Sequence, residues 1–137
     1  MSLRVIPLLV ISFIVYNVVV LLGGDATAEA ILSKQLFAVP MVSGARWVFT
    51  IGDLIILLTM ILLFAELIKS TYTTSSQMVD HGLSMLVFIA CLVEFLLVQK
   101  ATSSVFFIIL TATLIDVVAG ALIGIRTARR DLNFGGE

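Results

Sequence analysis

The stretch Trp47–Leu67, WVFTIGDLIILLTMILLFAEL, decides the fold class of this chain. Its charged residues are Asp53 and Glu66, and most of the others are Leu, Ile, Val, Phe or Met. A helix needs about 20 mostly apolar residues to cross the hydrocarbon core of a bilayer, and this stretch is long enough. The sequence therefore predicts a membrane-spanning helix over residues 47–67.

The composition of the whole chain agrees with this prediction. Of its 137 residues, 61% are hydrophobic and 12% are charged, and the mean hydropathy is +1.21. Soluble domains contain about 45–50% apolar and about 25% charged residues. Because so short a chain cannot close a core around this much apolar surface, we expect a lipid bilayer to surround it. The net charge of −1, without a basic patch, argues against binding to nucleic acid.

Three more segments, residues 5–22, 77–99 and 103–125, are predicted spans. The first of them is longer than the roughly 7–15 apolar residues of a signal peptide, so we expect it to persist as a helix. The chain is thus predicted to be all-α: one transmembrane domain, folded as an integral membrane four-helix bundle. Residues 23–46 are the predicted outer loop and residues 126–137 a cytoplasmic tail.

The basic residues near the helix ends predict the orientation. One side holds Arg4, Lys69, Arg126, Arg129 and Arg130, and the other holds Lys34, Arg46 and Lys100. Cytoplasmic loops carry an excess of Lys and Arg. The five-to-three distribution therefore predicts that both termini face the cytoplasm.

The outer loop is partly apolar. Its stretch Ala26–Phe37 has apolar residues at helical spacing, with Asp25 as a possible N-cap and Pro40 to end it. This pattern predicts a short interfacial helix on the outer membrane surface. The following residues 37–42, FAVPMV, are too apolar for a solvated loop, and we expect them to pack against the helices of their own chain.

Several polar residues fall inside the predicted spans. A rise of about 1.5 Å per residue places Asn17, Asp53, Glu94 and Thr111 in one layer of the outer leaflet. Asp116 lies roughly 8 Å deeper, near the midplane. An ionisable residue at mid-helix costs about 2.5–3.5 kcal/mol.

Two interpretations of this polar layer remain open. It either fastens the helices by hydrogen bonds of about 0.6 kcal/mol each, or it binds a proton, a metal cation or donor groups of a ligand. Two carboxyl groups at one depth in a low-dielectric layer cannot both ionise cheaply.

The fourth predicted span carries a stripe at i+4 spacing, formed by Ala112, Asp116, Gly120 and Gly124. Small residues allow another helix to approach closely in lipid. The stripe therefore predicts helix packing, either within the bundle or at a homo-oligomer seam, and it predicts that Asp116 faces protein.

Other residues are expected near the headgroup boundaries. Arg46 and Trp47 form a predicted interfacial anchor pair, although a charged mouth above Asp53 is an alternative. His81 is expected to be interfacial rather than a haem or metal ligand or a proton relay. Glu66 lies three residues before Lys69, a spacing that predicts an ion pair at a helix end.

The sequence lacks patterns that are typical of catalytic or metal sites. Cys91 is the only cysteine, so neither an intrachain disulfide nor a Cys/His metal spacing is available. There is no phosphate-binding loop, zinc set or nucleophile motif. We therefore expect no catalytic residues, no metal, no cofactor and no enzymatic activity.

The run DHGLSMLVFIACLVEFLLV at residues 80–98 and the run IDVVAG at residues 115–120 resemble uncharacterised small bacterial four-helix inner-membrane proteins. The resemblance implies a multi-pass protein of the bacterial inner membrane and implies no activity. Small multidrug transporters are similar in size but depend on a glutamate in the first helix, where this chain offers Tyr16 and Asn17.

These observations leave three functional hypotheses. The first is a non-enzymatic membrane protein, either a self-associating bundle or an accessory subunit, whose partner is another copy or another membrane protein. The second is a small proton- or cation-coupled transporter or channel that uses Asp53, Glu94 and Asp116. The third is a binder of lipid, quinone or pigment, because apolar pockets leave little trace in a sequence.

Overall fold

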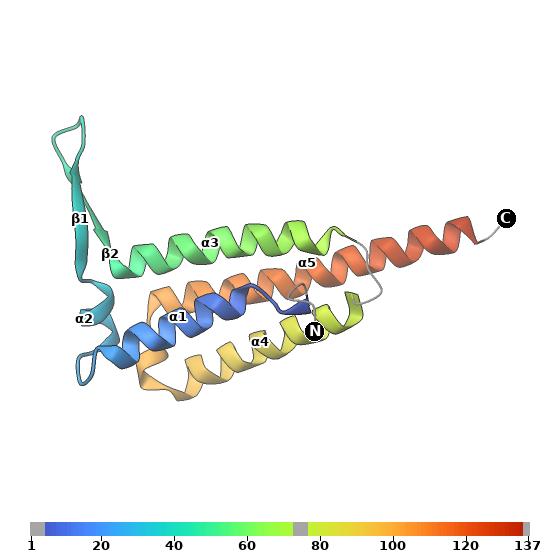
Figure 1. Ribbon diagram of the computed structural model, residues 1–137, viewed down its shortest axis with the longest axis horizontal. Coiled ribbons are helices and arrows are strands. Elements are labelled where there is room, and N and C mark those ends of the chain that lie inside the picture. Colours follow the sequence, from blue (N-terminus) through green and yellow to red (C-terminus); the bar gives the residue numbers. More distant parts are fainter. Residues whose placement is uncertain (1–4, 73–76, 136–137) are drawn as a thin grey trace.

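The computed structural model describes residues 5–72 and 77–135 and is mostly helical (Figure 1). Its elements in chain order are α1 (Leu9–Leu22), α2 (Ala28–Leu32), β1 (Gln35–Pro40), β2 (Arg46–Thr50), α3 (Ile51–Ser70), α4 (Gln77–Leu97), the 3-10 helix η2 (Gln99–Ala101) and α5 (Ser104–Phe134). Arg4, counted above for orientation, lies outside the described residues.

The long helices α1, α3, α4 and α5 lie side by side, and α5 contacts each of the other three (Figure 1). Among the described residues, three helical segments are long and apolar enough to cross a membrane: Ile51–Ser70, Met78–Leu97 and Ser104–Arg130. Helix α1 is also apolar, but it has 14 residues and is shorter than a typical span.

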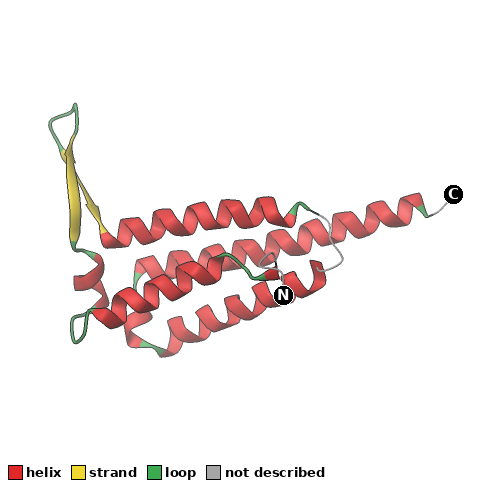
Figure 2. Cartoon of the chain, in the orientation of Figure 1, coloured by secondary structure: helices red, strands yellow, loops and turns green. Residues whose placement is uncertain are grey.

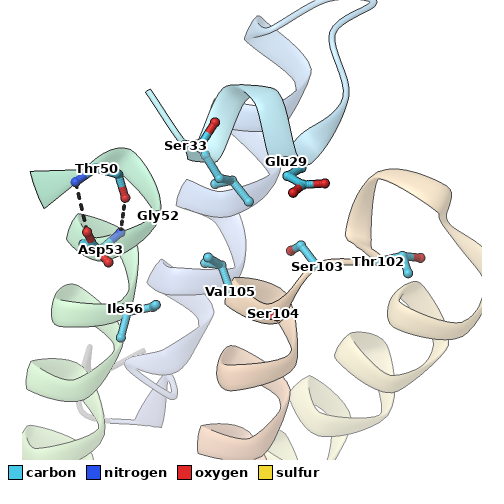
Figure 3. A pocket seen from close by; sticks show the side chains of 11 residues that line it. Glu29, Ser33, Thr50, Gly52, Asp53, Ile56, Thr102, Ser103, Ser104 and Val105 are labelled. Atoms are coloured by element: carbon cyan, nitrogen blue, oxygen red, sulfur yellow. Dashed lines mark hydrogen bonds between the residues drawn. The ribbon is translucent and has the colours of Figure 1, made fainter. Parts of the chain in front are cut away.

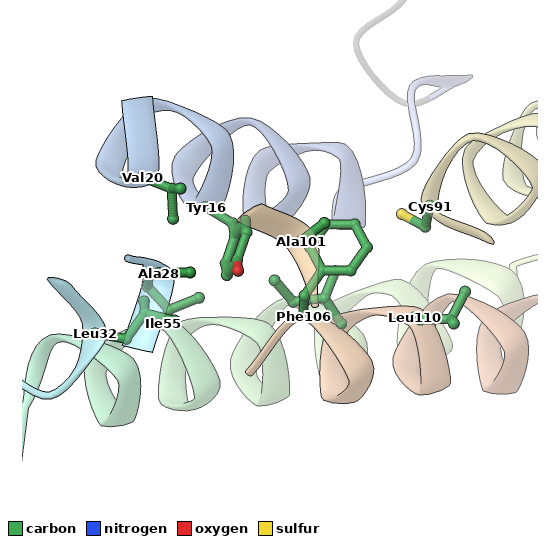
Figure 4. Packing of buried hydrophobic residues seen from close by; sticks show 10 residues of the cluster. Tyr16, Val20, Ala28, Leu32, Ile55, Cys91, Ala101, Phe106 and Leu110 are labelled. Carbon is green, nitrogen blue, oxygen red and sulfur yellow. The ribbon is translucent and has the colours of Figure 1, made fainter. Parts of the chain in front are cut away.

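The core lies between the helices, toward the end that carries the hairpin (Figure 4). Phe106 is completely buried, and its ring meets Tyr16 edge-on at a centroid distance of 4.9 Å. Tyr16 hydroxyl donates a hydrogen bond to the Lys100 carbonyl oxygen at 2.8 Å. This bond ties α1 to the short connection between α4 and α5.

The observed helix boundaries differ from the predicted spans. Helix α1 begins at Leu9 rather than at residue 5, and α4 ends at Leu97 rather than at residue 99. Helix α3 begins at Ile51 rather than at Trp47, because Thr50 and Asp53 form a capping box at that point. Helix α5 continues to Phe134, so most of the predicted tail after residue 125 is helical. In Figure 1, this part of α5 extends beyond the other helices.

The predicted outer loop contains a β-hairpin, so the all-α prediction is wrong there (Figure 2). Strands β1 and β2 pair antiparallel, with Phe37 opposite Phe49 and Val39 opposite Trp47. Gly44 allows the turn, since its φ of 88° is unfavourable for other residues. Aromatic and β-branched residues favour strand pairing, which here overrides the helical spacing of the apolar residues.

The interfacial helix predicted over Ala26–Phe37 is reduced to the five residues of α2. Its N-cap is Thr27, whose side chain accepts a hydrogen bond from the Ala30 N–H at 3.2 Å, and not Asp25. The helix ends at Leu32 because the chain turns into β1 soon afterwards.

Residues 37–42 do not pack against the helices of their own chain, contrary to the prediction. They belong to the hairpin, which points away from the helices (Figure 1). Phe37 and Met41 are exposed, and Val42 at the tip is fully exposed. Most apolar side chains of the hairpin are therefore exposed, whereas Phe49, near its root, is buried at 8% exposure.

Candidate functional site: polar contacts between the helices

Two members of the predicted polar layer meet between α1 and α4. The Asn17 side-chain N–H donates a hydrogen bond to Glu94 Oε2 at 3.3 Å. The same amide group also donates to the Phe13 carbonyl oxygen at 2.9 Å, which fixes the direction of the side chain. The structure thus brings together a neutral donor and one carboxyl group.

Asp53 and Thr111 do not join this pair. Asp53 Oδ2 accepts the Thr50 N–H at 3.0 Å, and the Asp53 N–H donates to Thr50 Oγ1 at 3.2 Å, so this carboxyl group caps α3. Thr111 is exposed and donates to the Phe107 carbonyl oxygen of its own helix at 2.9 Å. Equal depth was not enough to bring these side chains together, because it does not define the direction in which each one faces.

A second group of polar residues lies near the opposite end of the helices from the hairpin. We call Glu66, Lys69, Asp80 and Asp116 the charged cluster. Glu66 and Lys69 form the predicted ion pair, with Lys69 Nζ at 3.1 Å from Glu66 Oε1. Lys69 Nζ also lies 3.4 Å from Asp80 Oδ1 and thereby connects α3 with α4.

Glu66 is the most deeply placed member of the charged cluster, with only 1% of its surface exposed. Its Oε2 atom accepts a hydrogen bond from the Leu8 N–H at 2.8 Å, just before α1. Lys69 Nζ donates to the nearby Ile6 carbonyl oxygen at 3.0 Å. The Glu66 carboxyl group therefore faces the interior and holds the start of α1.

Asp116 on α5 completes the charged cluster. It is 5% exposed, so it faces protein as the stripe on this helix predicted. The Ser84 hydroxyl of α4 forms a hydrogen bond with its carboxyl group, and Glu66, Asp80 and Lys69 lie within electrostatic range. Glu66 and Asp80 therefore pair with Lys69, and Asp116 lies nearby, where α3, α4 and α5 meet. The sequence signals for this arrangement were the i+3 spacing of Glu66 and Lys69 and the position of Asp116 on the stripe of small residues.

The small residues of the stripe have different environments. Ala112 is buried at 2% exposure. A side chain at Gly120 would come within 3.1 Å of His81 Nδ1, whereas a Cβ atom at Gly124 would meet nothing within 4 Å. Gly120 thus makes room for an imidazole ring rather than for a helix backbone. Gly124 is not a packing position within the described part of the chain.

His81 lies beside the charged cluster, on α4. Its Nδ1 atom is buried and has no hydrogen-bond partner among the described residues. Among the described residues, no three His, Cys, Asp or Glu side chains are arranged to hold a metal ion.

A cleft of about 410 Å³ lies at the hairpin end of the helices (Figure 3). It is bordered by α2, the start of α3 and the turn before α5. Its polar lining consists of Glu29, Ser33, Thr50, Asp53, Thr102, Ser103 and Ser104. The sequence did not predict this cleft, because its walls come from three separate segments. The Asp53 carboxyl group in its wall is already engaged in the cap of α3.

Comparison with known proteins gives no assignment: no family model, no curated protein and no solved structure matches this chain.

Proposed function

We propose that this chain is a non-enzymatic multi-pass protein of the bacterial inner membrane, acting as a self-associating bundle or as an accessory subunit of a membrane complex. In this proposal α1, α3, α4 and α5 are four spans, and both termini face the cytoplasm. The observation that carries this proposal is a series of hydrogen bonds between polar groups. These bonds join α1 to the rest of the bundle along its whole length.

These contacts join α1 first to α3, then to the turn before α5, and then to α4. Glu66 of α3 accepts the Leu8 N–H at 2.8 Å, and the hydroxyl groups of Ser12 and Thr59 lie 3.0 Å apart. Further along α1, Tyr16 Oη lies 2.7 Å from Ser103 Oγ. The Asn17–Glu94 bond follows, at 3.3 Å.

This arrangement supports a fastening role. Helix α1 is the shortest of the four long helices, so it has the least apolar surface to pack. Hydrogen bonds between helices in membranes contribute about 0.6 kcal/mol each, and several together hold a short helix in place. The polar residues of α1 therefore have a structural use that requires neither a substrate nor a cofactor.

The outward faces of the long helices support placement in lipid. They expose large apolar side chains, including Leu57, Met60, Ile61 and Phe64 on α3, Leu86, Ile89 and Val93 on α4, and Phe107, Leu114 and Val118 on α5. Such continuous apolar surface is unfavourable in water and favourable against acyl chains. Lys69 and the exposed Arg126 and Arg129 lie toward the far end from the hairpin, which supports a cytoplasmic position for that end.

The proposal is tested by purifying the chain in mild detergent under native conditions and measuring the mass of the particle. We expect a homo-oligomer or a complex with another membrane protein. Proteoliposomes of the same preparation should conduct neither protons nor monovalent cations above the level of empty vesicles. A monomeric particle with steady flux would overturn the proposal.

A proton- or cation-coupled transporter is the second candidate. The charged cluster favours it, because Lys69 pairs with Glu66 and Asp80 while the third carboxyl group, of Asp116, lies nearby, and ionisable residues within spans are often functional. Under this alternative, Asp116→Asn would abolish flux in proteoliposomes and leave the fold intact. Thr111→Val, an exposed position, is the matched control and would leave flux unchanged.

A further inference from the structure

The hairpin is anchored rigidly to the helices at its root. Strand β2 leads directly into α3, and the capping box of Thr50 and Asp53 fixes this junction. On the other strand, the Lys34 carbonyl oxygen accepts the Ile51 N–H at 3.0 Å. Both strands are therefore held at the level where α3 begins, and the hairpin runs crosswise to the helices (Figure 1).

The hairpin carries apolar side chains on both faces, and one of these faces also carries Arg46. Phe37, Val39, Trp47 and Phe49 share one face, where Phe37 stacks on Phe49 at 4.8 Å and Trp47 meets Phe49 edge-on at 5.5 Å. The other face holds the pair Ala38 and Val48 and, toward the tip, the pair Pro40 and Arg46. A solvated antiparallel hairpin usually has one polar face, and a lone two-stranded hairpin is marginally stable in water.

The charge of this segment has one sign. From Lys34 to Gly52 the sequence contains Lys34 and Arg46 and neither Asp nor Glu. Both basic residues are exposed, and Arg46 stands opposite Pro40 in the ladder. Lys and Arg beside apolar and aromatic side chains match a boundary at which lipid phosphates lie above acyl chains.

We propose that the hairpin lies in the headgroup–acyl boundary of the membrane, on the outer leaflet beside α3. Trp47 and Phe37 contact the upper acyl chains, the apolar tip at Met41 and Val42 dips among them, and Lys34 and Arg46 pair with phosphate groups. The hairpin thereby anchors the outer ends of the helices at a fixed depth in the membrane. This inference rests on the proposed membrane insertion.

Trp47 is the only tryptophan of the chain and reports directly on this surface. The full-length protein is reconstituted into vesicles of phosphatidylethanolamine and phosphatidylglycerol that contain acyl chains spin-labelled either near the headgroup or near the bilayer centre. We expect a blue-shifted Trp47 emission that is quenched more strongly by the shallow label than by the deep one. Iodide in the water should quench it weakly.

Val42→Asp provides a sharper test. Val42 is fully exposed at the tip, so the change removes no contact within the chain. We expect the carboxylate to draw the hairpin toward water, with less quenching by the shallow label and more by iodide. Ala26→Asp, an exposed position outside the hairpin at the same end, is the matched control and should keep the wild-type quenching.

Two outcomes would overturn the inference. If iodide quenches Trp47 strongly and neither lipid label does, the hairpin lies in water. If Trp47 is shielded from both lipid labels and iodide, and stays shielded in detergent in a dimeric particle, then a second copy covers the hairpin through its open strand edges.

Extraction of vesicles at alkaline pH separates this inference from the proposed function. If the chain resists extraction while Trp47 lies in water, the proposed membrane insertion stands and the inference about the hairpin is wrong. If the chain is extracted, both the proposed membrane insertion and the inference about the hairpin are wrong, because the helices are then not inserted.

Discussion

Glu66 Oε2 on α3 accepts the backbone N–H of Leu8 at 2.8 Å, across 58 positions of sequence. The first N–H groups of a helix lack partners within it, and a carboxyl group near a helix N-terminus also interacts favourably with the helix dipole. Residues that precede α1 offer no side-chain cap, since the N-cap position is Leu8. Glu66 therefore supplies from another helix the cap that α1 lacks locally.

Replacing Glu66 should loosen the start of α1. Glu66→Ala leaves the partly buried Leu8 N–H without its acceptor and should lower the free energy of unfolding by about 1–3 kcal/mol. Glu66→Gln keeps a side-chain oxygen and should lose less. Thermal unfolding in detergent measures both changes, and Glu29→Ala at an exposed position is the control. Equal melting temperatures for Glu66→Ala and the control would refute the remote cap.

The Asn17–Glu94 contact should appear as a coupling between α1 and α4. In a double-mutant cycle with Asn17→Ala and Glu94→Ala, we expect a coupling free energy of about 0.6 kcal/mol. Reversible unfolding in mixed micelles provides the four stabilities. Thr111→Val should change stability by less than about 0.5 kcal/mol, because Thr111 is exposed and bonds within its own helix. Additive effects in the cycle would mean that the two side chains do not interact.

Two glycines of α5 form a matched pair for substitution. Gly120→Leu should push the side chain into His81 and destabilise the α4–α5 contact by about 1–3 kcal/mol, as overpacking does. A Cβ atom at Gly124 meets no described atom within 4 Å, so Gly124→Leu should leave the stability of a single chain nearly unchanged. Circular dichroism melting compares the two variants. A larger loss for Gly124→Leu, accompanied by a smaller particle mass, would instead place an oligomer seam at Gly124.

The orientation of the chain is testable with reporter fusions. We expect a phosphatase fused after residue 137 to be inactive and a fluorescent protein at the same place to be active, because the basic residues of α5 favour a cytoplasmic C-terminus. A phosphatase inserted at Ser43, in the hairpin turn, should be active and serves as the positive counterpart. Phosphatase activity at the C-terminus, with none at Ser43, would show the opposite orientation of the chain in the membrane.

The amino-acid sequence determined by itself the features that depend on composition and short spacing. The lengths of the apolar runs located α3, α4 and α5, because helix length and hydropathy are properties of a continuous segment. The Glu66–Lys69 ion pair followed from an i+3 spacing, which places two side chains on one face of any helix. The Asn17–Glu94 contact was anticipated as part of a larger layer, since equal depth can be estimated by counting residues.

Only the tertiary structure decided which residues share a contact. The cap of α1 by Glu66, the meeting of Asp80 and Asp116 near Lys69, and the space that Gly120 leaves for His81 depend on how separate helices rotate and pack. The hairpin was missed because its apolar residues fit both a helical and a strand pattern, and strand pairing between residues 35–40 and 46–50 resolved that ambiguity. Depth along a helix is a local property, whereas the direction in which a side chain faces is set by its neighbours.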